Sequence, residues 1–280
     1  GTYNFLTDDI GDFGITYDFI DGDDPDSWEA LRKPNTRAIY VESLSNPLVQ
    51  IADHQAVVAF ARKHGLVSLI DNTFASPVNF RPLTVGYDIE LHSATKYLNG
   101  HSDVVAGAII GRAKWLERID KRLSHLGGSL DAHACFLLER GLKTLVLRVR
   151  QQGQNALALA RHLDGRDDVA KVHYPGLESH SGHVRARELL ASFGGMLSFE
   201  LVGGAAAAER FVSRIELAMH APSLGGVESL VTRPAATSHA GMSADERARM
   251  GVTDGLMRVS VGIEHVDDLI GDFDRALAAE

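Results

Sequence analysis

Hydrophobic and polar positions in the first half of the chain follow the alternating pattern of strands and helices. Residues 66–71 form a nearly unbroken apolar run that ends in Asp71, as expected for a strand covered on both faces of its sheet. Residues 53–64 carry an apolar stripe at helical spacing, and Gly65 follows as a stop signal. We also expect strands at 15–20, 36–42, 88–92 and 104–111, and a short helix at 26–33. This alternation predicts an α/β fold with a mostly parallel, doubly wound sheet.

The pattern changes after about Gly141, where one long helix is expected over residues 142–163. Strands are then expected at 169–173, 196–201 and 256–261, and helices at 181–192, 205–215 and 266–279. Helices packed on a small sheet are typical of an α+β domain. We therefore expect a large domain, residues 1–143, and a smaller C-terminal α+β domain, residues 144–280.

Composition narrows the classes of function that the chain can have. It has 280 residues, 45% of them apolar, which is enough for a large core. Its net charge of −9 gives no electrostatic support for binding nucleic acid. Cys135 is the only cysteine, so no disulfide forms within the chain and a reducing, cytoplasmic location is expected. Because no apolar run approaches the length of a membrane span and the start has no signal pattern, no membrane partner is expected.

The strongest chemical signal comes from polar groups at the ends of two expected strands. One strand ends in Asp71, and another runs into the turn Ser93-Ala-Thr95-Lys96. A lysine beside two small hydroxyls suits an amine that forms an imine and lies near a phosphate, if burial or a cation lowers its pKa. An acid that keeps a pyridine nitrogen protonated and a lysine that holds an aldehyde together make a pyridoxal phosphate (PLP) site. The alternative for Lys96 is a solvated surface group, the usual setting of a lysine.

Three other positions have competing interpretations. Asn46 precedes Pro47, which marks a turn, yet loops at the carboxyl ends of strands are where open α/β sheets bind ligands. Arg258 interrupts an apolar strand, so it either faces water or pairs with an anion such as a carboxylate, and the pattern alone favours water. The glycine-rich segment from Ser223 to Ser229 has the composition of a flexible turn.

Motifs of other enzyme classes do not occur in the sequence. The closest histidine pair, His180 and His183, lies in a turn-rich stretch and is not the His-Glu-x-x-His helix of a zinc protease. We therefore expect no metal. The sequence also contains neither the Gly-x-Gly-x-x-Gly motif of dinucleotide binding nor the Gly-x-Ser-x-Gly motif of many hydrolases.

The segments Asp71-Asn-Thr-Phe-Ala-Ser-Pro77 and His92-Ser-Ala-Thr-Lys-Tyr-Leu-Asn-Gly-His101 closely resemble the Cys/Met metabolism family of PLP enzymes. This family contains cystathionine γ-lyase, cystathionine γ-synthase, cystathionine β-lyase and methionine γ-lyase. The similarity continues in family order through residues 42–47, 140–144, 174–177, 223–229 and 258–262. The resemblance implies a fold-type-I, PLP-dependent transferase-like large domain, a smaller α+β domain, and assembly into a homodimer or homotetramer.

The resemblance also implies roles for individual residues. Lys96 would hold the cofactor as a Schiff base, and Asp71 would pair with the pyridinium nitrogen. Ser93 and Thr95 would contact the cofactor phosphate. The carboxylate of an amino-acid substrate would be held by Asn46, Ser223, Ser238 and Arg258. For Ser223 and Arg258 this reverses the interpretations that the local pattern favours.

The implied activity is that of a carbon–sulfur lyase of trans-sulfuration, most like cystathionine γ-lyase, that cleaves cystathionine by γ-elimination. Cystathionine γ-synthase and methionine γ-lyase are the alternatives. Ser43-Leu-Ser45 precedes Asn46 where many relatives have Ser-Pro-Thr, which is a mild departure. The family's N-terminal region, with a ring-stacking tyrosine and a Gly-Met phosphate cradle, has no counterpart in the given residues. From this we expect an N-terminally incomplete large domain that by itself binds PLP poorly, and a non-catalytic assembly fragment is the alternative of another class.

Overall fold

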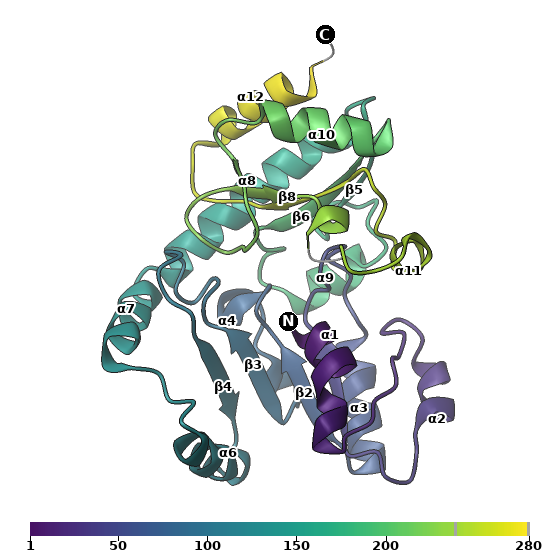
Figure 1. Ribbon diagram of the computed structural model, residues 1–280, viewed down its shortest axis with the longest axis vertical. Helices are drawn as coiled ribbons and strands as arrows, with labels where there is room; N and C mark the ends of the chain where they lie inside the picture. The colour runs from purple at the N-terminus through teal and green to yellow at the C-terminus, as the bar shows by residue number, and fades with distance from the viewer. Residues whose placement is uncertain (238–239, 279–280) are drawn as a thin grey trace.

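The first sheet of the protein is four-stranded and comes from the first half of the chain. The structure is a computed structural model that describes residues 1–237 and 240–278. Strands β1, β2 and β3 are parallel, and β4 is antiparallel to β3 (Figure 1). Their order in the sheet is β1 (Ala38–Glu42), β2 (Val67–Asp71), β3 (Ile89–Ser93) and β4 (Gly107–Gly111). The expected α/β fold with a mostly parallel sheet is confirmed.

Helix α3 (His54–His64) packs against β1 and β2, and it begins and ends where the sequence predicts. The Asp53 side chain accepts the Ala56 N–H at 2.9 Å and so satisfies a donor of the first turn. Gly65 ends the helix in the left-handed conformation, with φ of 65°. The other helical segments of this half are α1 (Thr2–Asn4), η1 (Phe5–Asp9), η2 (Ile10–Phe13), η3 (Pro25–Ser27), α2 (Trp28–Leu31), α4 (Ser76–Asn79), α5 (Pro82–Val85), α6 (Ala113–Leu126) and α7 (Ala132–Leu142).

The second sheet is five-stranded and belongs to the second half of the chain. Its order is β5 (Val169–His173), β6 (Met196–Leu201), β9 (Leu256–Ser260), β8 (Leu230–Thr232) and β7 (Met219–His220). Within the described part of the chain, the edge pair β7 and β8 is parallel and the other strand pairs of this sheet are antiparallel. Its helical segments are α8 (Leu145–Asp164), α9 (His183–Leu189), α10 (Gly204–Arg214), η4 (Pro234–Ala236), α11 (Ala244–Arg249) and α12 (Val266–Leu277). Helix α12 packs against both α8 and α10, and α8 and α10 pack against this sheet, which is the expected α+β arrangement.

Three expectations about local structure need correction. The strand expected at 15–20 is wrong, because the segment has no regular secondary structure and belongs to neither sheet. Phe19 instead stacks on Tyr3, with ring centroids 5.5 Å apart. The helix expected at 26–33 is only a short 3-10 turn followed by α2. Helices α6 and α7 were not expected at all, although the apolar stripe of α6 is strong enough to be found from sequence.

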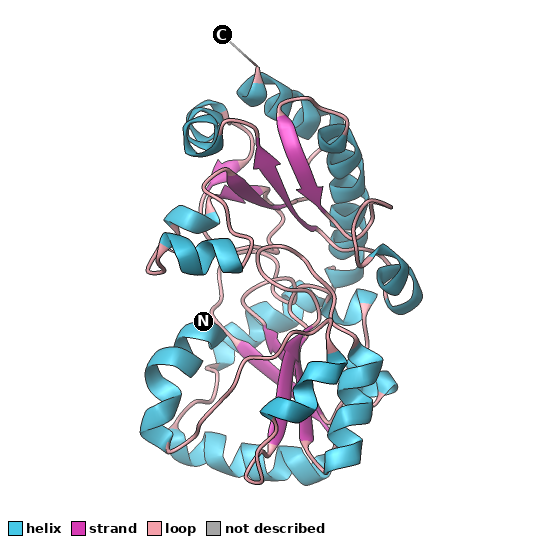
Figure 2. Ribbon diagram, turned by 90° about the vertical axis from the view of Figure 1, so that its right-hand side faces the viewer, coloured by secondary structure: helices cyan, strands magenta, loops and turns pink. Residues whose placement is uncertain are grey.

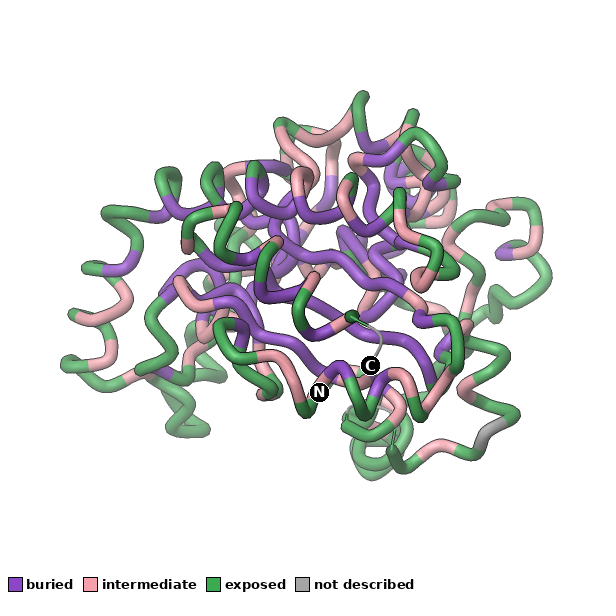
Figure 3. Tube along the Cα trace, turned by 90° about the horizontal axis from the view of Figure 1, so that it is seen from above, coloured by how far each residue is buried: buried purple, intermediate pink, exposed green. Residues whose placement is uncertain are grey.

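Helix α8 contributes to the hydrophobic cores of both halves. Leu145 and Val149 near its start are buried in the core that surrounds the first sheet, while Leu159 and Leu163 are buried against the second. Figure 1 shows α8 running from the end of α7 up to α12, and Figure 3 shows the buried strands enclosed by more exposed segments. The division at residues 143 and 144 stays a prediction. Among the described residues, no helix is both long and apolar enough to cross a membrane.

Candidate active site

Loops that follow the strands of both sheets meet in the region between the sheets (Figure 2). In the register of β1 and β2, Glu42 lies beside Asp71 at the carboxyl ends of the two strands. Strand β3 ends at the same edge with Ser93. In open α/β sheets this edge is where ligands bind, so the fold brings the expected strand-end groups to the edge where a ligand would bind.

Lys96 lies in the turn after β3 and reaches a segment from the other half of the chain. Its Nζ donates a hydrogen bond of 2.7 Å to the Ser223 hydroxyl, which is 127 positions away in the sequence. Burial and the neighbouring positive charge of Arg258 lower the pKa of Lys96. Lys96 is therefore not the solvated surface lysine of the alternative interpretation, and a larger share of its amine is neutral than in a free lysine.

Arg258 lies on β9 and is only 6% exposed. Its Nη1 donates to the Asn46 side-chain oxygen at 3.0 Å, and its Nη2 donates to the Ser223 carbonyl at 2.9 Å. Its Nε has no hydrogen-bond partner, and no carboxylate of residues 1–237 or 240–278 forms an ion pair with it. Burial lowers the pKa of Arg258 to about 10. A buried guanidinium without an anionic partner can bind a carboxylate, and its burial excludes the interpretation that it faces water.

The glycine-rich segment that begins at Ser223 is held in one conformation by its contacts. Ser223 has φ of 90°, which is uncommon for a residue other than glycine. A side chain at Gly225 would place its Cβ 2.7 Å from the Tyr97 nitrogen, so glycine is required for this close approach. The Val227 N–H donates to the Gly100 carbonyl at 3.0 Å. The segment therefore connects the Lys96 turn to the second sheet and is not a flexible turn.

Asp71 is fixed by donors from two directions. Its Oδ1 accepts the Thr73 N–H at 2.9 Å, and its Oδ2 lies 3.4 Å from the Tyr40 hydroxyl, which donates to it. Loss of hydration and the negative charge of Asp71 raise the pKa of Glu42 to about 7. Glu42 remains exposed, so the surrounding protein removes only part of its water. Two neighbouring carboxylates repel each other, and a cation placed beside them would relieve that repulsion.

The two hydroxyls expected at the cofactor phosphate differ in their surroundings. The Thr95 hydroxyl donates to the Ala106 carbonyl at 3.3 Å and accepts the Ala106 N–H at 3.0 Å. The Ser93 N–H donates to the Thr73 hydroxyl at 2.8 Å, whereas the Ser93 hydroxyl forms no hydrogen bond within the described part of the chain. Ser93 is thus the more available of the two for a phosphate. Ser238, expected near the substrate carboxylate, lies outside the described residues.

The residues present fit PLP in charge and in chemistry. Asp71 and Glu42 suit a protonated ring nitrogen, and Lys96 is an amine whose lowered pKa favours its reactive neutral form. Arg258 is a separate cation without an anion, which leaves it for the carboxylate of a substrate.

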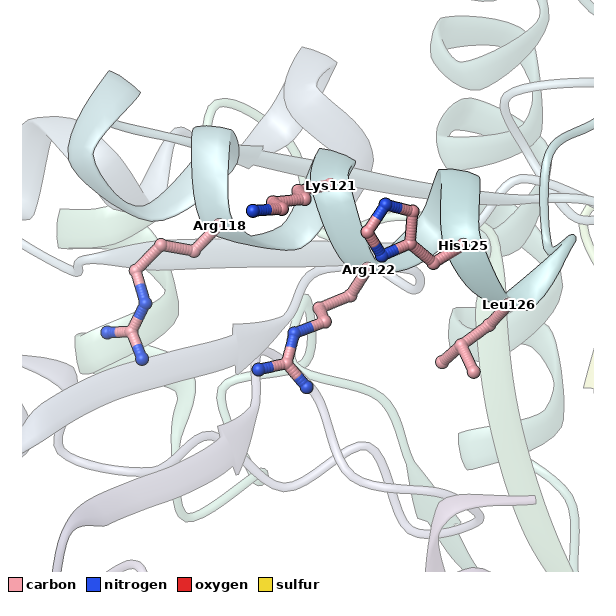
Figure 4. Close-up of a pocket in the computed structure, with 5 residues that line it drawn as sticks. All are labelled: Arg118, Lys121, Arg122, His125 and Leu126. Atoms are coloured by element: carbon pink, nitrogen blue, oxygen red, sulfur yellow. The ribbon is translucent and has the colours of Figure 1, made fainter.

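A hollow of about 470 Å³ elsewhere in the protein does not belong to this group. Figure 4 shows its lining side chains projecting from helix α6: Arg118, Lys121, Arg122, His125 and Leu126. All of them come from one helix, and none contacts the residues around Lys96 in the interactions described above. The candidate active site is therefore the group between the two sheets and not this basic hollow.

Sequence reasoning missed several groups that the structure places around the site. Glu42 could have been noticed as a second carboxylate at a strand end. Gln152 and Asn155 lie in the polar run at residues 150–155, where nothing in the sequence distinguishes them from the exposed Gln151 and Gln154. Tyr40 carries no signal in the sequence, because only the register of β1 and β2 brings it to Asp71. Thr73 follows Asp71 by two residues, so its contact with Asp71 is a local one.

Comparisons with known proteins identify what the chain is similar to. A family model described as "Cys/Met metabolism PLP-dependent enzyme" matches residues 1–278. L-methionine γ-lyase from Pseudomonas putida is 43% identical over 282 aligned residues, which cover 99% of this chain and 70% of that protein. Cystathionine β-lyase from Lactococcus lactis subsp. cremoris (strain MG1363) is 42% identical over 99% of this chain and 73% of that protein. The crystal structure of cystathionine γ-lyase from Lactobacillus plantarum complexed with L-serine matches with a TM-score of 0.94 and 38% identity, over 98% of this chain and 72% of that one.

Proposed function

Because this chain belongs to the Cys/Met metabolism family of PLP-dependent enzymes, we propose that it is a carbon–sulfur lyase that cleaves cystathionine by γ-elimination. The named relatives are lyases for cystathionine or methionine, which supports a sulfur-containing amino acid as the substrate. The observation that carries the proposal is the Ser223 bridge. The Ser223 hydroxyl accepts a hydrogen bond from the Lys96 amine, and the Ser223 carbonyl accepts one from the Arg258 guanidinium. One residue therefore holds a reactive amine near a cation that can bind a carboxylate.

PLP, when bound, supplies an aldehyde for the substrate amine and a ring that accepts the electrons of a broken bond at Cα. Arg258 and Asn46 orient the substrate by its carboxylate. Lys96, whose pKa is lowered by burial and by Arg258, removes the proton from Cα and returns a proton later in the reaction. Ser223 sets the direction of the Lys96 amine. Asp71 holds a proton on the ring nitrogen by its negative charge.

An assay with L-cystathionine tests the proposed function directly. Cleavage at Cγ should release cysteine, 2-oxobutanoate and ammonia, all of which can be quantified from one reaction. Homocysteine and pyruvate would instead identify a β-lyase, and methanethiol from L-methionine would identify a methionine γ-lyase. Absence of all these products from enzyme loaded with PLP would contradict a lyase function.

Three other functions are alternatives to cystathionine γ-cleavage. Methionine γ-lyase is favoured by the relative at 43% identity, and cystathionine γ-synthase shares the first steps of γ-elimination but then adds a thiol. A non-catalytic assembly role belongs to another class and is opposed by the contact between Lys96 and Ser223. A visible absorbance band after addition of PLP supports the enzyme, and its absence supports the assembly role.

We also propose that the protein associates with itself in the cytoplasm. The exposed apolar side chains of α7 and of the start of α8 support an interface with a second copy, chiefly Phe136 and Leu147. The single cysteine, Cys135, is consistent with a reducing compartment. Sedimentation analysis should give a dimer or tetramer, and Leu147→Glu should shift the protein toward smaller species. A monomer at micromolar concentration would contradict this part of the proposal.

A further inference from the structure

Helix α8 carries three buried polar side chains on one face. Arg148, Gln152 and Asn155 are 4%, 0% and 2% exposed, and their spacing of four and three residues aligns them along the helix. Buried polar groups need hydrogen-bond partners. Each of these side chains donates to backbone carbonyls that lie outside the helix. No ion pair involving Arg148 occurs among the described residues, so its charge is offset only by carbonyl and hydroxyl oxygens.

Arg148 holds the turn that contains Lys96. Its Nη1 donates to the carbonyl of Tyr97, the residue after Lys96, at 2.9 Å. Its Nη2 donates to the Gly141 carbonyl at 2.8 Å. Gly100, at the end of the same turn, has φ of 74°, and a Cβ there would collide with the Arg148 guanidinium. The guanidinium is therefore packed tightly into the Lys96 turn.

Gln152 and Asn155 hold the two segments on the other side of the site. Gln152 Nε2 donates to the Gly226 carbonyl at 2.6 Å, three residues after Ser223. Asn155 Nδ2 donates to the Gly262 carbonyl at 3.1 Å and to the Glu264 carbonyl at 2.8 Å. Gly262 follows the strand that carries Arg258. One helix thus reaches both segments that hold the expected carboxylate-binding groups.

The position of these donors is fixed by the helix. Residues four and three apart on an α-helix are separated by about 6 Å and about 4.5 Å along its axis. Helix α8 is anchored in both cores, through Leu145 and Val149 at one end and Leu159 and Leu163 at the other. Its buried donors therefore form a rigid row between the two sheets.

We propose that Arg148, Gln152 and Asn155 are positioning residues that set the separation between the Lys96 turn and the Ser223–Arg258 group. The residues act through the segments they hold and do not touch the reacting atoms. Only the expected effects on substrate binding rest on the proposed function. Because Arg148 and Gln152 hold different segments, their variants should have separable effects, which a general role in stability would not produce.

The first test compares Gln152→Met with Gln154→Met. Methionine is close in size to glutamine but cannot donate to the Gly226 carbonyl. Gln154 is exposed on the same helix, so its variant controls for the substitution itself. Amide hydrogen exchange of Gly225 and Val227 in the PLP-free chain should be roughly tenfold faster in Gln152→Met, as for the loss of one hydrogen bond, and unchanged in Gln154→Met.

The kinetic counterpart uses the PLP-loaded enzyme and the sulfur amino acid that it cleaves. Gln152→Met should raise KM by roughly tenfold with a smaller change in kcat, because the carboxylate-binding segment is loosened. The visible absorbance of bound PLP should stay as in the unmodified protein. Gln154→Met should match the unmodified protein in both respects.

The second test uses Arg148→Lys, which keeps the charge but replaces the guanidinium fork by one ammonium. This variant should weaken PLP binding by roughly tenfold, since the Lys96 turn loses carbonyl contacts, while KM changes less than in Gln152→Met. The PLP affinity of Arg148→Lys also tests the proposal if Gln152→Met does not fold.

Three outcomes overturn the proposal. One is unchanged amide exchange at Gly225 and Val227 in folded Gln152→Met. Another is the same loss of PLP affinity and the same rise of KM in Gln152→Met and Arg148→Lys, which would indicate a general loss of stability. The third is unchanged PLP affinity in Arg148→Lys. If the unmodified enzyme cleaves no sulfur amino acid, the proposed function fails, but the exchange and PLP-binding results still decide the role of α8.

Discussion

The candidate site has an acidic half and a basic half that are built in different ways. The acidic half consists of Glu42 and Asp71, which are neighbours in the parallel register of β1 and β2 and are partly reached by water. The basic half joins Lys96 to Arg258 through Ser223, and Arg258 is almost completely buried. Two hydrated carboxylates can lie close to each other at a modest cost in free energy, whereas a buried cation needs hydrogen bonds in fixed directions. Changes in the basic half should therefore disturb the geometry needed for proton transfer and substrate binding, whereas changes in the acidic half should act through the loss of negative charge.

The largest effect is expected from Lys96→Ala, which removes the amine of the basic half. Turnover should fall by about 10³-fold or more, because the proposed proton-transfer group is lost. Borohydride reduction of the PLP-loaded protein followed by peptide mapping should place the phosphopyridoxyl group on Lys96. Lys143→Ala is a control, because that lysine is exposed at the end of α7 and forms its ion pair with Glu139 of that helix. A label on Lys143 or Lys171 would disprove the assignment.

A smaller loss is expected from Asp71→Ala, which leaves Glu42 as the only carboxylate of the acidic half. The pKa of a ring nitrogen should drop when its charge partner is removed, so turnover should fall by about 10²-fold while PLP still binds. Steady-state kinetics and a PLP titration measure the two quantities separately. Near-normal turnover would remove Asp71 from the mechanism.

Arg258→Lys sharpens the comparison, because it keeps the charge of the basic half but loses the fork geometry. A lysine cannot bond Asn46 and Ser223 while also holding a carboxylate with two parallel hydrogen bonds. We expect KM to rise by about 10- to 100-fold, which corresponds to the loss of one charge-assisted hydrogen bond. The absorbance of bound PLP should not change. An unaltered KM would mean that the carboxylate is held elsewhere.

The smallest effect is expected from Glu42→Gln, and it depends on pH. The pKa of Glu42 is raised to about 7 in the folded chain, above the ordinary value near 4.5. The folded chain therefore loses stability relative to the unfolded chain as pH rises from about 4.5 to about 7, and the loss is complete above that. Glu42→Gln should raise Tm at pH 8 by on the order of 2 °C, a modest amount because Glu42 is exposed, and change it little at pH 4.

Thermal unfolding of the PLP-free protein at the two pH values measures this difference. Exposed Glu178→Gln on the other half of the chain is a suitable control for the loss of one surface charge. A Tm difference that does not depend on pH would show that Glu42 and Asp71 do not repel each other as the register implies.

Local patterns predicted the elements whose signals lie within a few residues. Helix α3 begins and ends where Asp53 and Gly65 indicate, and strands β5 and β6 have the expected bounds. The alternating apolar residues at 15–20 were misleading, because a strand also needs a hydrogen-bonding neighbour and this segment has none in the described structure.

The same distinction applies to the candidate functional residues. Asp71 and Lys96 are predicted from sequence because one ends an apolar strand and the other lies in the turn after one, and the family is recognised from the segments that surround them. The local pattern favoured a solvated Arg258 and a flexible segment at Ser223, and only the resemblance pointed the other way. For both Arg258 and Ser223, the adjacent residues in the sequence do not indicate which distant residues will contact them in the folded protein.

The sequence by itself determined the family, the α/β fold and the strand ends that carry Asp71 and Lys96, because these depend on short-range patterns. The tertiary structure decided that Arg258 is buried, that it bonds Asn46 across 212 positions, and that Ser223 joins it to Lys96. It also decided that the buried face of α8 reaches both sides of the site. Burial and hydrogen bonds between distant segments arise only when the two sheets pack around one helix, and no local pattern encodes that packing.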